Sequence, residues 1–218
     1  MGHLQKFALP PLLFGNERAQ LHTCAQAFGD KVDAIFPGLI AYEPTPTSNG
    51  IFRSKSDQIE LDGVSLMSAS VSPTYVERKN NTVLTLLLPI TGDPVCSAQV
   101  GADRVGWGLN QCGVLLPITD ERVIGTGGFR NQLMLQVDAD CLQAQAQSML
   151  GLRETSISLG TDTIKRLSLV HGRVSLLQPI IQTIPLLRDY LDQPAILNQL
   201  KINDFLLRAN APHNTNTK

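Results

Sequence analysis

The sequence predicts an α+β fold, in which a small antiparallel β barrel precedes a helical segment. Between Val64 and Val137, short apolar runs are separated by the turn sequences SP, NN, TGD, GAD, GLNQ and GTGG. Their spacing of roughly 8–12 residues is typical of barrels and sandwiches. After Val137 the apolar residues follow helical spacing, and strands followed by helices indicate α+β. We therefore expect a helix and barrel in residues 1–137, and a helical segment in residues 138–218 packed on the barrel as one unit.

Composition limits the classes of protein that this chain can belong to. It has 218 residues, of which 43% are hydrophobic, enough to bury a sizeable core. The net charge of −1 gives no field that would attract nucleic acid or anionic lipid. No apolar stretch approaches the ~20 residues that span a bilayer, and the first 15 residues lack the pattern of a signal peptide. We expect a cytoplasmic protein without a membrane partner.

The N-terminal part is predicted to contain one helix. The sequence FALPPLLFG is interrupted by two prolines, so we expect it to lie over the barrel rather than to form a helix. Asn16 is the predicted N-cap of a helix over residues 16–29, and Gly29 is its predicted end. Residues 36–55 contain two prolines in PTP and an NG pair, which predict an extended loop.

Six apolar runs are the predicted strands of the barrel. Val83 to Leu88 is apolar almost throughout, which places it at the centre, whereas Ser65 to Val71 alternates and is expected nearer solvent. The glycines of GTGGF, residues 125–129, are expected in a tight turn. The runs are Ser65 to Val71, Thr74 to Lys79, Thr82 to Pro89, Val95 to Val100, Gly113 to Pro117 and Leu133 to Val137.

Three helices are predicted after the strands. The first covers Ala139 to Leu150, with Asp138 as N-cap, the second covers residues 175–192, and the third begins at Pro194. In the second, apolar residues repeat with heptad spacing, which predicts a homodimer seam. The seam residues are Leu177, Ile180, Ile184, Leu187 and Leu191. The alternative is an amphipathic helix buried wholly within one subunit, and the prolines at 179 and 185 are expected to shift its start and bend it.

The chain lacks the usual signatures of catalysis and metal binding. Its four histidines all lie outside the apolar runs, and no GxSxG, P-loop or GxGxxG sequence is present. We therefore expect no catalytic residue, no metal and no cofactor. The four cysteines (Cys24, Cys96, Cys112 and Cys141) have no CxxC spacing and are expected as buried reduced thiols. Tyr75, Arg78, Trp107 and Arg130 are the predicted ligand contacts, since they can face a cavity.

The order of these segments resembles a known family. Residues 52–142 run through an SP turn, a charged strand, LLLP, a glycine-rich hairpin, GVLLP, an Arg/Gly segment and LMLQV to a helix, and ERAQLHTCAQAFG precedes them. This order resembles the N-terminal regulatory domain of AraC-type transcriptional regulators, of the cupin-like AraC-binding type, over roughly Asn16 to Arg208. The resemblance implies a cupin-like barrel that senses a small molecule, with a C-terminal helical dimerisation segment.

The resemblance ends before the DNA-reading part. In the family, about 100 residues with two helix-turn-helix units normally follow, whereas this sequence stops at Lys218. We therefore expect a non-catalytic domain that binds a small-molecule effector and forms a homodimer, and that does not bind DNA by itself. Two alternatives stay open. One is an oligomerisation or partner-docking domain whose barrel is filled with side chains, and the other is a cupin-type enzyme.

Overall fold

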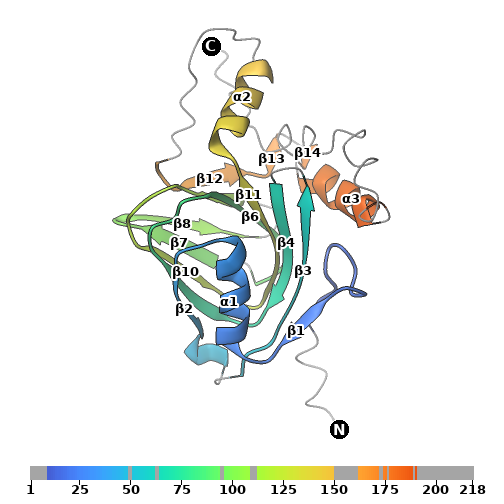
Figure 1. Cartoon of the computed structure of the whole chain (residues 1–218), viewed down its shortest axis with the longest axis vertical. Coiled ribbons are helices and arrows are strands. Elements are labelled where there is room, and N and C mark those ends of the chain that lie inside the picture. Colours follow the sequence, from blue (N-terminus) through green and yellow to red (C-terminus); the bar gives the residue numbers. More distant parts are fainter. Residues whose placement is uncertain are drawn as a thin grey trace.

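The computed structural model describes residues 9–48, 51–61, 64–93, 96–108, 112–149, 162–171, 174–175, 177–188 and 190. Two antiparallel β-sheets make up most of its regular secondary structure (Figure 1). The strands of the larger sheet are β1 (Gln20–His22), β3 (Ser54–Leu61), β4 (Val64–Val71), β6 (Leu84–Gly92), β9 (Cys112–Leu116), β11 (Arg130–Val137) and β12 (Lys165–Ser168). Those of the smaller sheet are β2 (Leu39–Pro44), β5 (Thr74–Arg78), β7 (Cys96–Val100), β8 (Asp103–Trp107) and β10 (Val123–Gly127).

The helices and one short hairpin complete the described chain. The larger sheet has the order β1-β3-β4-β11-β6-β9-β12, and the smaller one has the order β2-β5-β10-β7-β8. The remaining elements are α1 (Ala25–Ile35), the 3-10 turn η2 (Pro46–Ser48), α2 (Ala139–Met149), the hairpin of β13 (Val170–His171) with β14 (Val174–Ser175), and α3 (Leu177–Arg188). The fold is thus β-rich α+β, as the sequence predicted.

The two sheets face each other without forming one closed barrel. At one side, a bridge between Gly108 and Cys112 brings the end of β8 to β9. At the opposite side, α1 contacts both β1 and β2, and so fills the space between the edges of the two sheets. In Figure 1, α1 lies across this opening. The closed cupin-like barrel of the sequence prediction is therefore replaced by two sheets and a helix that together surround an inner space.

Strand β4 separates two cores, and this corrects its predicted position near solvent. Val64 and Leu66 point to the outer face of the larger sheet, whereas Met67, Ala69 and Val71 point to the space between the sheets. All five side chains are buried. The alternation of the sequence is real, but both faces are covered, so it does not mark an exposed side.

The outer core lies between the larger sheet and α3. It combines Leu86 of β6 and Leu133 and Leu135 of β11 with Ile180 and Ile184 of α3. Each such side chain contributes about 1.5–3 kcal/mol when it is fully buried. The prediction that the Val83 to Leu88 run is central is confirmed, because β6 lies between β11 and β9.

The N-terminal segment covers another part of the same outer face. Phe14 is buried there, the backbone N–H of Leu13 donates to Ser68 Oγ at 3.0 Å, and Asn131 Nδ2 donates to the carbonyl of Pro11 at 2.6 Å. The prediction that this segment lies over the strands is confirmed for residues 9–15.

The predicted dimer seam requires a correction. Leu177, Ile180 and Ile184 are 2%, 2% and 0% exposed, because they pack into the outer core of their own chain. These three side chains therefore leave no surface for a partner helix. Their burial agrees with the alternative prediction, a helix buried wholly within one subunit. The side chain of Leu187 and all of Leu191 lie outside the described residues. Homodimerisation itself stays a prediction.

The predicted helix over residues 16–29 is also corrected. Residues 20–22 form β1, which pairs with β3, and α1 begins only at Ala25 and ends at Ile35. Asn16 does not cap a helix, because its Oδ1 accepts hydrogen bonds from the Leu12 N–H at 3.3 Å and from Lys55 Nζ at 2.9 Å. The apolar face of α1 is formed by Phe28, Val32 and Ile35, which are all buried.

Gly29 explains why the end of the helix was misplaced. It lies inside α1, where a Cβ would stand 2.9 Å from the Cβ of Tyr42 and 3.1 Å from a methyl carbon of Leu39. The glycine therefore allows α1 to pack directly on β2, and it is not a helix terminator.

Several strands escaped the sequence prediction. The predicted loop over residues 36–55 contains β2 and the start of β3, and the predicted GTGG turn belongs largely to β10, which pairs with both β5 and β7. Strand β8 was also missed, and β12 joins the larger sheet after α2, so residues 138–218 are not purely helical. Helix α2 is confirmed, and Asp138 Oδ1 accepts from the Cys141 N–H at 2.7 Å, as an N-cap does. The third predicted helix lies outside the described residues.

The cysteines only partly follow their prediction. All four are free thiols, but Cys24 and Cys141 are exposed, whereas Cys96 and Cys112 are buried. Cys24 is the N-cap residue of α1, and Cys141 lies in the first turn of α2.

Candidate ligand-binding site

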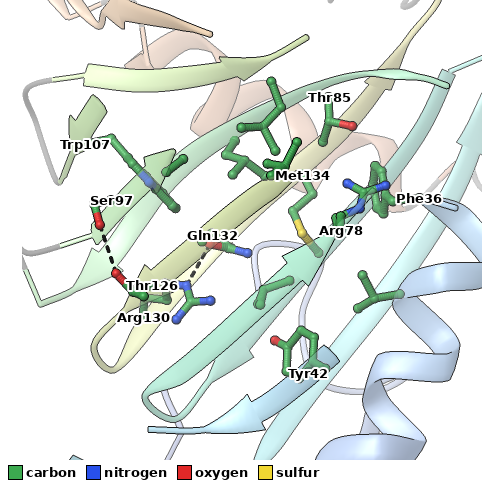
Figure 2. A pocket seen from close by; sticks show the side chains of 17 residues that line it. Phe36, Tyr42, Arg78, Thr85, Ser97, Trp107, Thr126, Arg130, Gln132 and Met134 are labelled. Carbon is green, nitrogen blue, oxygen red and sulfur yellow. Dashed lines mark hydrogen bonds between the residues drawn. The ribbon is translucent and has the colours of Figure 1, made fainter. Parts of the chain in front are cut away.

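A cavity of about 80 Å³ lies between the two sheets (Figure 2). This volume corresponds to about three water molecules in the liquid, well below the space that a drug-sized ligand needs. The lining comes from both sheets and from α1 with the residue after it. Its members are Val32, Phe36, Tyr42, Val76, Arg78, Thr85, Leu87, Ser97, Ala98, Trp107, Leu116, Val123, Gly125, Thr126, Arg130, Gln132 and Met134.

Strand alternation selects these residues. On β5, Thr74, Val76 and Arg78 point inward, and on β11, Arg130 and Met134 do so. Their sequence neighbours on β11 face the outer core instead. The result is a mainly apolar wall with a few convergent polar groups, which is the usual character of a small-molecule site.

Arg78 is a buried cation at one end of β5. The residue is 6% exposed, and one terminal nitrogen of its guanidinium donates to the carbonyl of Pro37 at 2.8 Å. The guanidinium carbon lies 6.0 Å from the centroid of the Phe36 ring, while Nε is buried without a hydrogen-bond partner. Burial lowers the pKa of Arg78 to about 10, against an opposing effect of Asp33. The group is therefore still charged at neutral pH.

Arg130 is a second buried cation, held by the protein on three sides. Its Nε donates to Gln132 Oε1 at 2.9 Å, and its terminal nitrogens donate to the Gly128 carbonyl at 3.1 Å and to Thr74 Oγ1 at 2.9 Å. Gly127 makes room for it, since a Cβ there would stand 2.8 Å from the guanidinium. Arg130 is thereby fixed in position at the edge of the cavity.

Trp107 and Tyr42 add polar groups to the wall. Trp107 is 6% exposed, and its indole Nε1 is buried without a hydrogen-bond partner. Burial raises the pKa of the Tyr42 phenol, although the Arg130 cation and the Thr74 hydroxyl oppose this rise. Tyr42 is therefore uncharged at neutral pH and keeps a hydroxyl proton that it can donate.

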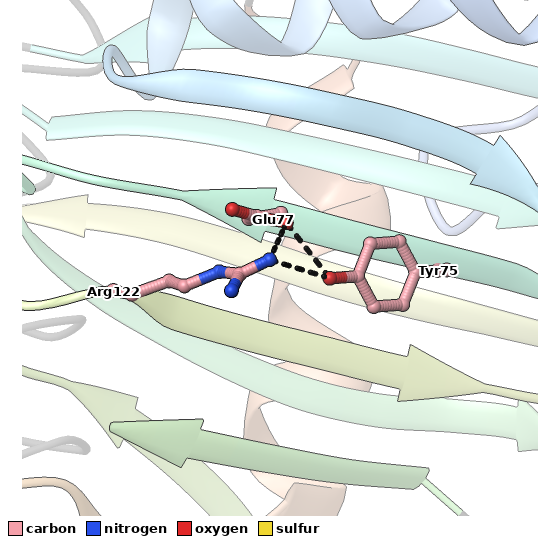
Figure 3. Close-up of polar contacts among 3 residues, drawn as sticks. All are labelled: Tyr75, Glu77 and Arg122. Carbon is pink, nitrogen blue, oxygen red and sulfur yellow. Dashed lines mark hydrogen bonds and ion pairs between the residues drawn. The ribbon is translucent and has the colours of Figure 1, made fainter. Parts of the chain in front are cut away.

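The structure brings together three of the four predicted ligand contacts. Arg78, Trp107 and Arg130 line the cavity, and whether they bind a ligand stays a prediction. Tyr75 does not line it, because it points to the outer face of the smaller sheet. There its hydroxyl donates to Glu77 Oε2 at 2.8 Å, and Arg122 contacts both side chains (Figure 3). The hydrogen bonds from Arg122 and Tyr75 hold the pKa of Glu77 below its usual value.

Other lining residues were missed by the sequence analysis. Gln132 and Met134 share the inward face of β11 with Arg130, so the alternation in RNQLMLQV could have found them once Arg130 was chosen. Thr85 was hidden in an almost continuous apolar run, and Tyr42 lay in the predicted loop. No local signal marked either position as inward.

The part of the chain that the structure describes contains neither a metal-binding cluster nor a membrane-spanning helix. Within it, no group of three or more His, Cys, Asp or Glu side chains is placed to hold a metal ion. The described helices are all too short or too polar to cross a membrane.

Comparison with known proteins finds similarity among solved structures. No protein-family model matches the chain, and no curated protein matches its sequence. Among solved structures, the crystal structure of the AraC-like transcriptional activator CuxR is similar, with a TM-score of 0.57 and 8% sequence identity. The alignment covers 88% of this chain and 69% of that one. At such low identity, the likeness shows a shared AraC-like fold.

Proposed function

We propose that this chain is a non-catalytic regulatory domain of the AraC type, which binds a small-molecule effector in the cavity between its sheets. The shared fold with an AraC-like transcriptional activator supports the regulatory role. The main observation in favour of an effector site concerns Trp107, which belongs to the cavity wall. Its indole Nε1 is buried and has no hydrogen-bond partner.

An unpartnered buried donor favours a ligand over a filled interior. Leaving such a group unsatisfied costs about 1–3 kcal/mol. Of the nine buried side-chain atoms without a partner in the described residues, two belong to the cavity wall, Arg78 Nε and Trp107 Nε1. An acceptor atom of an effector in the cavity would remove this cost. A domain that served only for oligomerisation or docking would need neither the cavity nor the unpaired donor.

The character of the cavity wall supports a binding role over catalysis. None of its 17 residues, all of them described, is a histidine, cysteine, aspartate or glutamate. The wall does contain hydroxyl side chains, but a hydroxyl nucleophile is activated by an adjacent general base, and none of the lining residues is a histidine or a carboxylate that could serve as one. We accordingly propose an effector-binding domain that works in the cytoplasm and as a homodimer. Its dimer contacts would involve residues other than the three that α3 commits to the outer core.

The proposal can be tested with the intrinsic fluorescence of Trp107, the single tryptophan of the chain. A library of small polar and charged metabolites would be titrated, with the melting temperature as a second readout, because a ligand of the folded state raises it. Ala98→Leu, which fills the cavity from β7, should abolish both responses to any hit. Gln99→Leu, on the opposite face of the same strand, is the matched control and should preserve them. Hits that bind Ala98→Leu unchanged would contradict the proposed site.

A further inference from the structure

We infer that the effector is a small organic carboxylate, whose anionic group pairs with Arg78 and whose apolar body extends along the cavity. This inference rests on the proposed function and names the chemical class of its ligand. It starts from the charges of the cavity.

The cavity has two buried positive charges that form no salt bridge, although the Asp33 carboxylate acts on Arg78 from outside the wall. Arg78 and Arg130 are 6% and 7% exposed, and neither forms an ion pair with a carboxylate of the described residues. The wall itself contains no acidic side chain. Buried charges are normally paired, because removing a cation from water is strongly unfavourable. Two buried cations facing one space therefore favour an anion in that space.

Arg78 is the better anchor of the two. A guanidinium has five N–H donors, and the hydrogen bonds of Arg78 within the described chain reach only the Pro37 carbonyl, with Nε left unpaired. Arg130, in contrast, uses all three of its nitrogens to bind protein groups. The fork of Arg78 is thus open to the two parallel hydrogen bonds that a carboxylate accepts.

The arrangement along β5 defines the rest of the ligand. Thr74, which binds Arg130, and Arg78 are the first and last residues of β5, about 13 Å apart along an extended strand. Figure 2 shows Arg78 and Arg130 on different sides of the cavity, with Gln132 and Met134 between them. Apolar side chains such as Val76 and Leu87 line this stretch. An inorganic anion would leave them without contacts, whereas a short aliphatic chain would cover them.

The lowered pKa of Arg78 agrees with this assignment. Burial disfavours its charged form, and a carboxylate in contact would restore it. The small cavity volume of about 80 Å³ then favours a short-chain acid.

The test is a titration of the full chain with butanoate and hexanoate, with butanamide and hexanamide as neutral counterparts, and with inorganic phosphate. Trp107 fluorescence and calorimetry are the readouts. We expect at least one acid to bind about 10-fold or more tightly than its amide, as hydrogen bonds to charged groups require. Arg78→Gln should remove this preference, and Arg122→Gln, an arginine on the outer face of the same sheet, should keep it. Arg78→Lys retains the charge but not the fork, so it should show an intermediate preference and serves as the test if Arg78→Gln does not fold.

Three results would overturn the inference. Acids and amides that bind equally, with no effect of Arg78→Gln, would show a neutral effector and leave the proposed function intact. Phosphate that binds more tightly than either acid would show a site for inorganic anions. Failure of both acids to bind at millimolar concentration, while neutral library compounds respond to Ala98→Leu, would refute the carboxylate and retain the cavity as the effector site.

Discussion

Side chains on the two faces of the larger sheet are packed to different degrees. On the outer face, Leu133 and Leu135 meet Ile180 and Ile184 of α3, and all four side chains are closed off from solvent. On the inner face, the same strand β11 presents Arg130 to a cavity. The outer face is explained fully by packing, whereas the inner face keeps space and charge that packing does not need.

The smaller sheet repeats this contrast with two arginines. Arg122, on its outer face, contacts Glu77 and Tyr75 and lies in solvent. Arg78, on its inner face, is buried and forms no salt bridge with a carboxylate of the described residues. A buried cation that forms no salt bridge lowers stability unless something else requires it, and this contrast is why we propose a ligand for the inner face.

The largest expected effect is on the outer face. Ile184→Asp should destabilise the protein by at least about 3 kcal/mol, because it places an unpaired carboxylate in a closed apolar core. Denaturant unfolding and light scattering would measure the result. A folded, monomeric Ile184→Asp beside a dimeric wild type would contradict this account and restore the predicted helix seam.

Two neighbours on β11 sharpen the contrast between the faces. Leu133→Ala should cost about 2–5 kcal/mol, as for buried leucines in general. Met134→Ala should cost clearly less, because Met134 already borders a cavity. Urea unfolding of both variants gives the comparison, and equal costs would indicate that the inner face is packed as tightly as the outer one.

The arginines should differ in the sign of their contribution to stability. Without ligand, Arg78→Met should leave the free energy of unfolding unchanged or raise it by up to about 2 kcal/mol, because it removes a buried unpaired charge. The pKa of Arg78 is lowered on folding, so its destabilising effect is complete below about pH 10 and declines only above it. The gain should therefore be constant across the neutral range. A large loss of stability would show that Arg78 is structural.

Arg122→Met should produce a small loss of stability with the opposite pH behaviour. The pKa of Glu77 is lowered on folding, so the contribution of its pair with Arg122 is present above the usual carboxyl range and is lost as the pH falls through the folded pKa. Unfolding of wild type and variant at neutral and acidic pH measures the difference, which should vanish in acid. A difference that persists in acid would exclude the ion pair as its cause.

The smallest expected effect concerns DNA. Arg78 and Arg130 are buried, Arg122 is paired, and the net charge is −1, so the surface gives phosphates little attraction. Fluorescence anisotropy at low salt should show weak binding that does not depend on sequence. Tight binding to one DNA sequence would refute this prediction.

How much could be predicted depended on how each strand buries its side chains. Apolar runs such as β6 and β11 were found, because continuous burial leaves a clear pattern. Strand β3, with the sequence SKSDQIEL, was missed, because polar residues such as Lys55 are buried under the N-terminal segment, and only the tertiary fold shows that.

Which single residues line the cavity was equally hard to predict from the sequence. Tyr75 and Arg78 are three positions apart on one strand, so they had to point to opposite faces. The sequence alone could exclude that both line the cavity, but the choice between them required the position of α1 and the other sheet. The helix over residues 16–29 failed for a related reason, since Gly29 serves a contact with Tyr42 that is distant in sequence.

The most direct test is a crystal structure of the chain grown with butanoate, compared with one grown without it. The account predicts a carboxylate bound by two nitrogens of Arg78, with the alkyl chain beside Val76 and Leu87 inside the cavity. An unchanged cavity, with butanoate absent or bound only at surface cations such as Arg122, would contradict it.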